Sequence, residues 1–178
     1  LASMHSHSIS EVSSSFLIQS VILPSRGHCA LVSVLKYINL PSVTFSHLTL
    51  KDSKTYERFD KVVLTHTVQY PEELAYRSDL ESFNVESEKV THGRFTYFNT
   101  LTKAQWPREG RITNWIKNEE LTSEIGCEDI DAKSDRFMVC GSTGLNKDLI
   151  EYFESMGMQQ GNTKTPGEFV VEKAFVRR

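Results

Sequence analysis

The sequence contains little cysteine: the three residues Cys29, Cys127 and Cys140 are an odd number and form no C-x-x-C motif. A secreted disulfide framework typically has an even number of cysteines, and a structural zinc site typically has a closely spaced pair such as C-x-x-C. We therefore expect no disulfide framework, no metal site and a reducing compartment, which favours a cytoplasmic protein. A His-Ser-His sequence at residues 5–7 has no third candidate ligand nearby and is interpreted as part of a tail.

Long apolar runs and a surplus of positive charge are also missing. No apolar run approaches the ~20 residues that a membrane-spanning helix requires, and residues 16–23, FLIQSVIL, lack the basic flank of a signal peptide. The net charge of the 178-residue chain is −3, which is not typical of general nucleic-acid binding. We expect a globular protein with neither a membrane nor a nucleic-acid partner. Because the first residue is Leu1 rather than Met, we also expect a truncated piece of a longer product.

The common glycine-rich phosphate-binding motifs are absent as well, since the chain has no G-x-G-x-x-G and no G-x-x-x-x-G-K-[ST]. What the chain does have is two segments of different composition. Residues 1–49 are rich in serine with mixed periodicity, and their run CALVSVLKYINL fits either a short helix or a strand. Residues 50–178 show regular patterns. We predict a domain over 50–178, preceded by an atypical and poorly defined serine-rich segment.

In the regular part, strand patterns alternate with helix patterns. Strands are expected at 60–68, at 94–101, at 136–140 and in the closing run EFVVEKAFV, which are rich in apolar, β-branched or aromatic residues. Helices are expected in YPEELAYRSDLESF, RITNWIKNEEL and LNKDLIEYFESMG. This alternation predicts an α/β fold, an open and mainly parallel sheet with helices on both faces. Ligands of such folds bind beyond the carboxyl ends of the strands.

A glycine turn follows the strand that ends at Cys140. Gly141 and Gly144 allow close approach of the backbone to a ligand, and Ser142 or Thr143 can cap the helix that starts there. The free N–H groups of that helix start favour an anion or a polar ring. The alternative is an ordinary tight turn between a strand and a helix, which the residues of the turn alone favour.

Positive charges gather after the strand at 94–101. Lys103, Arg108 and Arg111 follow that strand, and Arg77 lies in the helix after another strand. A phosphate monoester needs more than one positive donor, because a single exposed ion pair contributes little. The alternative is solvated loop charge, an interpretation that is strongest for Arg108.

Three further side chains have two interpretations each. His66, at a strand end, is either a ligand contact or a hydrogen-bonded core histidine. Cys140 has the chemistry of a nucleophile, but no histidine is near it in the sequence, and its apolar strand indicates a buried thiol of ordinary reactivity. Phe175, in the run AFVRR, is either a core residue or lies flat against a ring ligand.

Taken together, four segments resemble the NADP-binding domain of bacterial ferredoxin–NADP reductases. They read TYERFDKVVLTHTVQYPEELAYR, GRITNWI, DRFMVCGSTGLNKDLIEYFESMG and PGEFVVEKAFV, in the order and at the spacing of that family. The resemblance covers residues 50–178, about seven tenths of the chain.

The resemblance implies an oxidoreductase that transfers electrons between NADPH and ferredoxin or flavodoxin through FAD. It implies that Cys140, Gly141 and Ser142 lie beside the nicotinamide at the flavin edge, with Thr143 in the same turn, and that Phe175 packs over the flavin. The protein's share of hydride transfer is then to position and orient two rings. Cys140 and Phe175 are therefore the expected catalytic residues, and the other three are expected cofactor contacts.

The resemblance also implies where the adenosine end of NADP is held. Arg111, in the segment GRIT, matches a family arginine that binds the adenosine 2′-phosphate. Lys103 stands where the family usually has an arginine, so the charge is kept but the planar fork is lost. His66 is a further expected cofactor contact. Gln69 stands where another arginine is usual, so the preference for NADPH is expected to be weakened.

Two parts of the family pattern are absent from this sequence, the FAD-binding barrel and the glycine-rich pyrophosphate loop. We therefore expect the chain by itself to be inactive. The alternatives are a non-catalytic NADP-binding or interaction remnant, and a subunit that complements a separate FAD domain.

Overall fold

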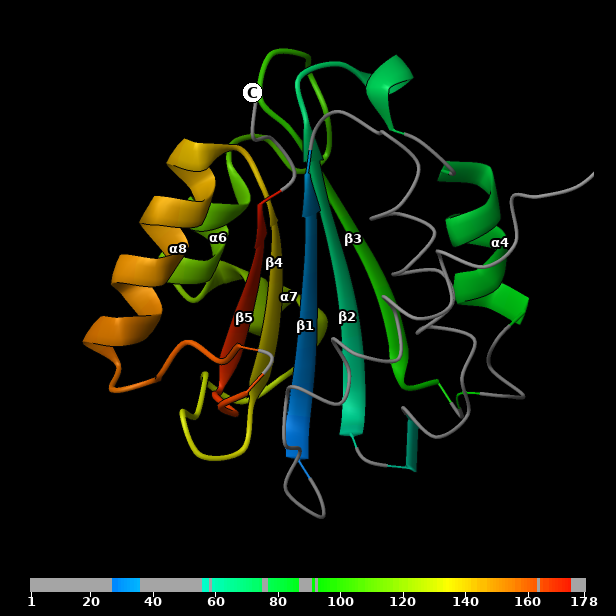
Figure 1. Ribbon diagram of the computed structural model, residues 1–178. Coiled ribbons are helices and arrows are strands. Elements are labelled where there is room, and N and C mark those ends of the chain that lie inside the picture. Colours follow the sequence, from blue (N-terminus) through cyan, green and yellow to red (C-terminus); the bar gives the residue numbers. More distant parts are fainter. Residues whose placement is uncertain are drawn as a thin grey trace, which may run out of the picture.

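Five strands in the computed structural model form one sheet with the order β3-β2-β1-β4-β5 (Figure 1). The residues that the structure describes are 27–35, 56–57, 59–74, 77–86, 91, 93–162 and 164–173. The strands are β1 (Gly27–Leu35), β2 (Phe59–Val68), β3 (Phe95–Leu101), β4 (Arg136–Gly141) and β5 (Phe169–Lys173). Every adjacent pair is parallel, which confirms the predicted α/β class with its mainly parallel sheet.

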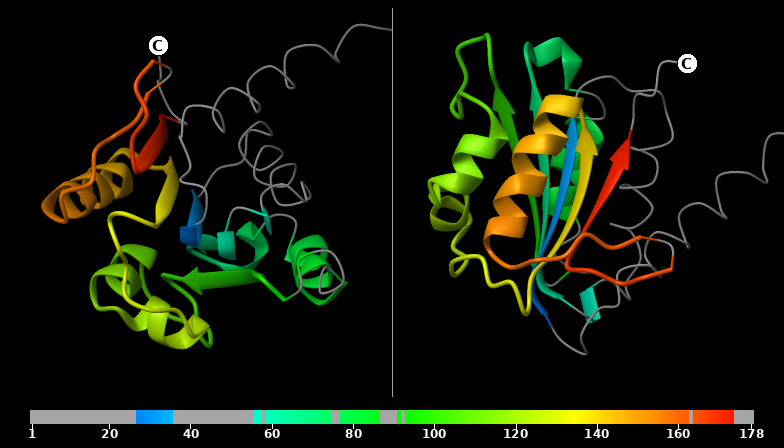
Figure 2. Two further views of the ribbon diagram at one scale, coloured as in Figure 1. Left: turned by 90° about the horizontal axis from the view of Figure 1, so that it is seen from below. Right: turned by 60° about the vertical axis from the view of Figure 1, so that its left-hand side comes forward.

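Helices cover both faces of this sheet (Figure 2). The helical segments are η1 (Pro71–Glu73), α4 (Arg77–Glu86), α6 (Ile112–Lys117), α7 (Glu120–Ile125) and α8 (Thr143–Ser155). In one buried cluster, side chains of α6, α7 and α8 pack on Val63, Phe98 and Val139 of the strands. In another, Leu80 of α4 packs with Val62. Val62 and Val63 are consecutive in β2 and so point to opposite faces of the sheet. None of the helices in the described ranges combines the length and apolar character needed to cross a bilayer.

The central strand β1 comes from the serine-rich N-terminal segment. Its Val34 is in register with His66 of β2 on one side and with Cys140 of β4 on the other. The run CALVSVLKYINL, which fits either a helix or a strand, is therefore a strand as far as Leu35, and its remaining residues lie outside the described part. The sheet thus extends across the predicted boundary near residue 50.

Helix α8 starts and ends where the sequence predicts. Ser142 is its N-cap residue, and the Ser142 hydroxyl oxygen accepts a hydrogen bond from the Leu145 N–H at 3.4 Å. Gly157 follows the C-cap residue with a φ of 83°, a left-handed conformation that favours glycine. The predicted apolar face is buried except at Met156, which is half-buried, and Met158 beyond the helix is buried instead.

Two of the predicted helices are interrupted. In the first, the 3-10 turn η1 ends at Glu73, Leu74 leaves the helical region with a ψ of 84°, and α4 begins at Arg77. In the second, α6 and α7 are separate because Glu119 between them has a left-handed φ of 61°. A left-handed residue cannot continue a right-handed helix. The helical spacing of the apolar side chains therefore continues beyond the point where the helix ends.

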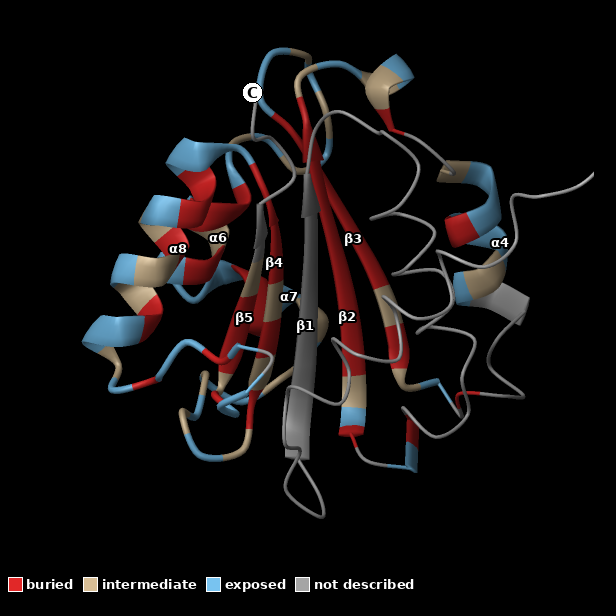
Figure 3. Ribbon diagram, in the orientation of Figure 1, coloured by how far each residue is buried: buried red, intermediate tan, exposed pale blue. Residues whose placement is uncertain are grey.

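Strand β2 is buried continuously from Val62 to Val68, as Figure 3 shows for the middle of the sheet. A strand covered on both faces is expected to be apolar at nearly every position. Thr65, His66 and Thr67 depart from this pattern and are nevertheless buried. These three polar residues lie towards the carboxyl end of β2, beside the candidate site.

Candidate functional site

The carboxyl ends of β2 and β3 and the turn after β4 meet around a cavity of about 240 Å³. Its lining residues come from these strand ends, from the segments that follow β2 and β3, and from helices α6 and α8: Thr67, Val68, Gln69, Thr102, Arg111, Thr113, Ser142, Gly144, Leu145 and Asp148. The chain adds β2 and β3 on one side of β1, and β4 and β5 on the other. Open α/β sheets bind ligands at the point where the strand order reverses in this way, beyond the carboxyl ends of the strands.

The glycine turn after β4 forms one wall of this cavity. Ser142 is exposed and lines the cavity together with Gly144. Thr143, in the first turn of α8, is exposed and lies outside the lining. Gly141 is buried, and Cys140 is only 4% exposed. The turn therefore presents backbone and the Ser142 hydroxyl to a ligand, and the Cys140 thiol lies behind them.

Arg111 and Lys103 supply positive charge near the cavity. Arg111 lines the cavity, is exposed, and forms no ion pair with any described residue. Lys103 is exposed and also lacks an ion-pair partner in the described ranges. Its backbone N–H donates to the oxygen of Gln69, a lining residue, at 3.1 Å. Two cations without ion-pair partners beside one cavity provide the charge that a phosphate monoester requires.

The other two cations of the predicted group are tied to carboxylates. Arg108 Nε lies 2.5 Å from Glu124 Oε1, and its guanidinium lies over the Phe98 ring, 4.5 Å from the centroid. Arg77 Nε lies 2.7 Å from Glu81 Oε1. The sequence places all four cations in one group, whereas in the structure Arg108 pairs with a carboxylate of α7 and Arg77 pairs with a carboxylate of its own helix, α4.

His66 is a buried residue of β2, 3% exposed, and does not line the cavity. Its Nδ1 lies 3.2 Å from the Tyr97 hydroxyl on β3. Burial lowers the pKa of His66 to about 4. Burial likewise raises the pKa of Tyr97 to about 12, so both side chains are neutral near neutral pH. This is the geometry of a hydrogen-bonded core histidine, and a role for His66 as a cofactor contact stays a prediction.

Acidification is expected to destabilise the fold through His66. Burial holds its pKa at about 4 in the folded state, whereas an unfolded histidine titrates near 6.5. The unfolded chain binds the proton first, so the stability due to the neutral ring is present above pH ~6.5 and lost as the pH falls towards ~4. Between pH ~7 and pH ~5 the loss should be about 2 kcal/mol. Urea unfolding at both pH values measures it, and His66→Gln, which does not titrate, should lose about 2 kcal/mol less. An equal loss in both proteins contradicts the prediction.

Several lining residues belong to no motif that the sequence shows. The Thr67 hydroxyl lies 2.7 Å from that of Thr100, which joins the ends of β2 and β3. Thr113 is buried in the first turn of α6, and Asp148 is a half-buried residue of α8. Among these residues, only Thr67 carries a signal in the sequence, which is its position at the end of a predicted strand. Phe175, the second predicted catalytic residue, lies outside the described residues.

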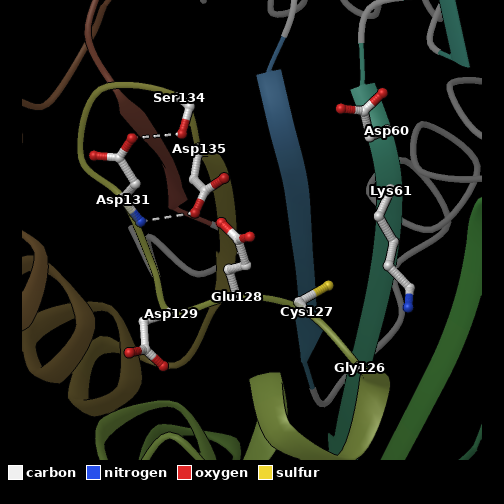
Figure 4. Close-up of a pocket in the computed structure, with 9 residues that line it drawn as sticks. All are labelled: Asp60, Lys61, Gly126, Cys127, Glu128, Asp129, Asp131, Ser134 and Asp135. Atoms are coloured by element: carbon white, nitrogen blue, oxygen red, sulfur yellow. Dashed lines mark hydrogen bonds between the residues drawn. The ribbon is translucent and has the colours of Figure 1, made fainter.

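A second cavity, of about 370 Å³, lies at the opposite edge of the sheet and is rich in acidic residues (Figure 4). Lys61 Nζ donates to the backbone oxygen of Ile125. The Asp131 N–H donates to Asp135 Oδ2 at 2.9 Å, and the Ser134 hydroxyl donates to Asp131 Oδ2 at 2.7 Å. Within the described residues, no three or more His, Cys, Asp or Glu side chains form a group that could hold a metal ion. The contacts of Asp131, Ser134 and Asp135 thus hold their own loop together, Lys61 joins β2 to the end of α7, and we assign no site here.

The solved structures that this fold resembles define its class. A ferredoxin NADP+ reductase from Neisseria gonorrhoeae, with FAD and NADP bound, aligns with a TM-score of 0.72 at 24% identity, over 90% of this chain and 60% of that one. The CS-b5R domains of human Ncb5or align with a TM-score of 0.57 at 16% identity, over 94% of this chain and 39% of that one. The fold is that of the NADP-binding domain of the ferredoxin reductase type.

Curated relatives identify the family. Ferredoxin–NADP reductase A of Sorangium cellulosum is 34% identical over 129 residues, 71% of this chain and 46% of the relative. The flavodoxin/ferredoxin–NADP reductase of Rhodobacter capsulatus is 33% identical over 130 residues, 71% of this chain and 48% of the relative. No family model matches the chain. The matched part of the chain belongs to the ferredoxin–NADP reductase family, which confirms the resemblance seen in the sequence. The chain spans about half the length of these curated relatives.

Proposed function

We propose that this chain is the NADP-binding portion of a ferredoxin–NADP reductase, and that NADP lies along the carboxyl edge of β2, β3 and β4. The observation that carries the proposal is the position of Arg111. It lines the cavity, without an ion-pair partner among the described residues, and Lys103 is close by on the chain with its charge equally unpaired in those ranges. An adenosine 2′-phosphate needs such a pair of positive donors.

The turn after β4 would take the nicotinamide end of NADP. Ser142 lines the cavity, and Gly141 before it lets the backbone come close to a ring. The N–H groups at the start of α8, including that of Thr143, favour polar groups of the ligand. Cys140 lies behind this turn, at 4% exposure, so its proposed part is to support the ring-binding surface. His66 would support the site from the core, and Phe175 is proposed on the resemblance alone.

In the full reaction that the resemblance implies, electrons would pass between NADPH and ferredoxin or flavodoxin. The chemistry that FAD would supply when bound is hydride exchange with NADP and single-electron transfer with the protein partner. Neither of the two cavities described above has an aromatic lining residue on which a flavin ring could stack. We therefore propose that FAD is held outside these two cavities. We further propose, on the resemblance alone, that this chain by itself does not turn over. Because of the same observation, a non-catalytic NADP-binding remnant is the alternative function.

Replacing Arg111 with alanine is expected to weaken the binding of 2′-phospho-AMP by about 10- to 100-fold, because losing a charge-assisted hydrogen bond costs ~1.5–3 kcal/mol. AMP has no 2′-phosphate, so it should bind the parent less tightly and respond little to the substitution. Calorimetric titration of the full chain with both ligands measures the two affinities.

Lys117→Ala is the matched control, since Lys117 is an exposed cation at the other end of the same helix, α6. It removes one positive charge and should leave both affinities unchanged. Equal binding of AMP and 2′-phospho-AMP by the parent overturns the proposal. Equal losses in the two variants would show a general charge effect and would overturn it as well.

A further inference from the structure

The loop of residues 102–110 joins β3 to α6 and lies between the two cations of the proposed site. Lys103 is near its start, and Arg111 follows its end. The base of the loop is closed, because the Gly110 N–H donates to the oxygen of Leu101 at 2.8 Å. Lys103 and Arg111 therefore stand on the two arms of one closed loop, and the conformation of this loop decides how they face a shared ligand.

Trp106 anchors the middle of this loop to the sheet. Its half-buried ring packs against the buried cluster of Val68, Leu74 and Leu101, at the carboxyl ends of β2 and β3. Its Nε1–H donates to Asn99 Oδ1 at 2.8 Å. Asn99 is only 7% exposed, so water can hardly replace the indole if this bond is lost. Leaving a buried amide oxygen without its donor costs free energy. The bond therefore favours the loop conformation in which it forms.

Contacts from two helices hold the same loop. The Arg77 guanidinium of α4 lies over the Trp106 ring, 4.8 Å from the centroid, and is itself held by Glu81 at 2.7 Å. From α6, Trp115 Nε1 donates to the backbone oxygen of Glu109 at 2.9 Å. The sequence has two tryptophans, and the indole N–H of each is used to fix this loop.

From these contacts we infer that Trp106 is a positioning residue of the NADP site, which holds the 102–110 loop in the form that presents Lys103 and Arg111 to one phosphate. The inference rests on the proposed function. Ordering a free loop costs conformational entropy, and a ligand that must order it binds more weakly than a ligand that finds it ordered. Trp106 removes that cost before the nucleotide arrives, without touching the nucleotide.

Trp106→Phe tests this inference, because it keeps an aromatic ring for the apolar contacts and for Arg77 but removes the N–H. We expect 2′-phospho-AMP to bind about 3- to 10-fold more weakly, as the loss of one hydrogen bond implies, and AMP to change by less than about 2-fold. Asn99→Ala removes the same bond from its other side. The double variant should lose no more than Asn99→Ala alone, because the bond that Trp106→Phe breaks is already absent there. Tyr152→Phe, which removes a hydroxyl from a half-buried ring of α8, is the control and should change neither affinity.

A measurement without ligand separates this inference from the proposed function. Trypsin should cleave after Lys103 several-fold faster in Trp106→Phe than in the parent, because cleavage needs a locally opened loop. If the parent prefers 2′-phospho-AMP but Trp106→Phe binds it as tightly as the parent does, the inference is overturned and the proposed function stands. If the parent shows no preference, the proposed function fails. The trypsin result then decides alone whether Trp106 holds the loop. An unchanged cleavage rate would show that it does not. Should Trp106→Phe not fold, Asn99→Ala supplies both readouts.

Discussion

Replacing Phe153 with alanine is expected to lower the free energy of unfolding by about 4 kcal/mol, as is typical of a large aromatic side chain removed from a packed core. Phe153 of α8 is 0% exposed. Its ring centroid lies 4.3 Å from that of Phe137 in β4 and 5.4 Å from that of Phe169 in β5. One side chain thus joins the helix to two strands. Alanine would leave a void that these rigid neighbours cannot fill.

Urea unfolding of the full chain measures this loss. Phe153→Leu keeps most of the volume and should cost less than about 1.5 kcal/mol. Tyr70→Ala removes an aromatic ring that is 41% exposed, and surface changes of this kind should stay within about 0.5 kcal/mol. A loss for Phe153→Ala no greater than that for Tyr70→Ala would contradict the account of the core. The result bears on the site as well, because α8 carries the Ser142 turn.

Gly167→Ala is expected to cost about 3 kcal/mol, the upper range for forcing an extra methyl group into a packed place. A Cβ atom at Gly167 would lie 2.3 Å from the backbone N of Gly161 and 2.4 Å from the backbone oxygen of Gln159. Both contacts are with backbone, so no side chain can move aside. The segments would have to separate, although the Glu168 N–H donates to the Gln159 oxygen at 3.0 Å and the Gly161 N–H to the Phe169 oxygen at 2.8 Å.

Gly144→Ala is the matched control, since a Cβ atom there meets nothing within 4 Å and Gly144 lies in the first turn of α8. It should be neutral or slightly stabilising, because alanine favours a helix over glycine. Urea unfolding compares the two variants. Similar stability of both would show that the close contact at Gly167 relaxes freely, contrary to the prediction.

The sequence by itself determined the features that depend on local chemistry. The β-branched run of β2, the Ser142 cap and the left-handed Gly157 can each be predicted from a short window, because a strand, a cap and a helix end are each set by a few neighbouring residues. The alternation of strands and helices then predicts a parallel sheet, and the edge at which Arg111 lies. The family follows from the resemblance over residues 50–178, and the relatives match 71% of the chain.

Only the tertiary structure decided which distant residues meet. Arg108 and Arg111 belong to the same short segment, yet Arg108 pairs with Glu124 of α7 while Arg111 lines the cavity. His66 is buried against Tyr97, a contact between two strands. A strand from the serine-rich segment entered the sheet between β2 and β4, although its pattern fits a helix equally well. Such outcomes depend on packing between elements far apart in the chain, where the burial of many side chains together outweighs the preference of any one segment.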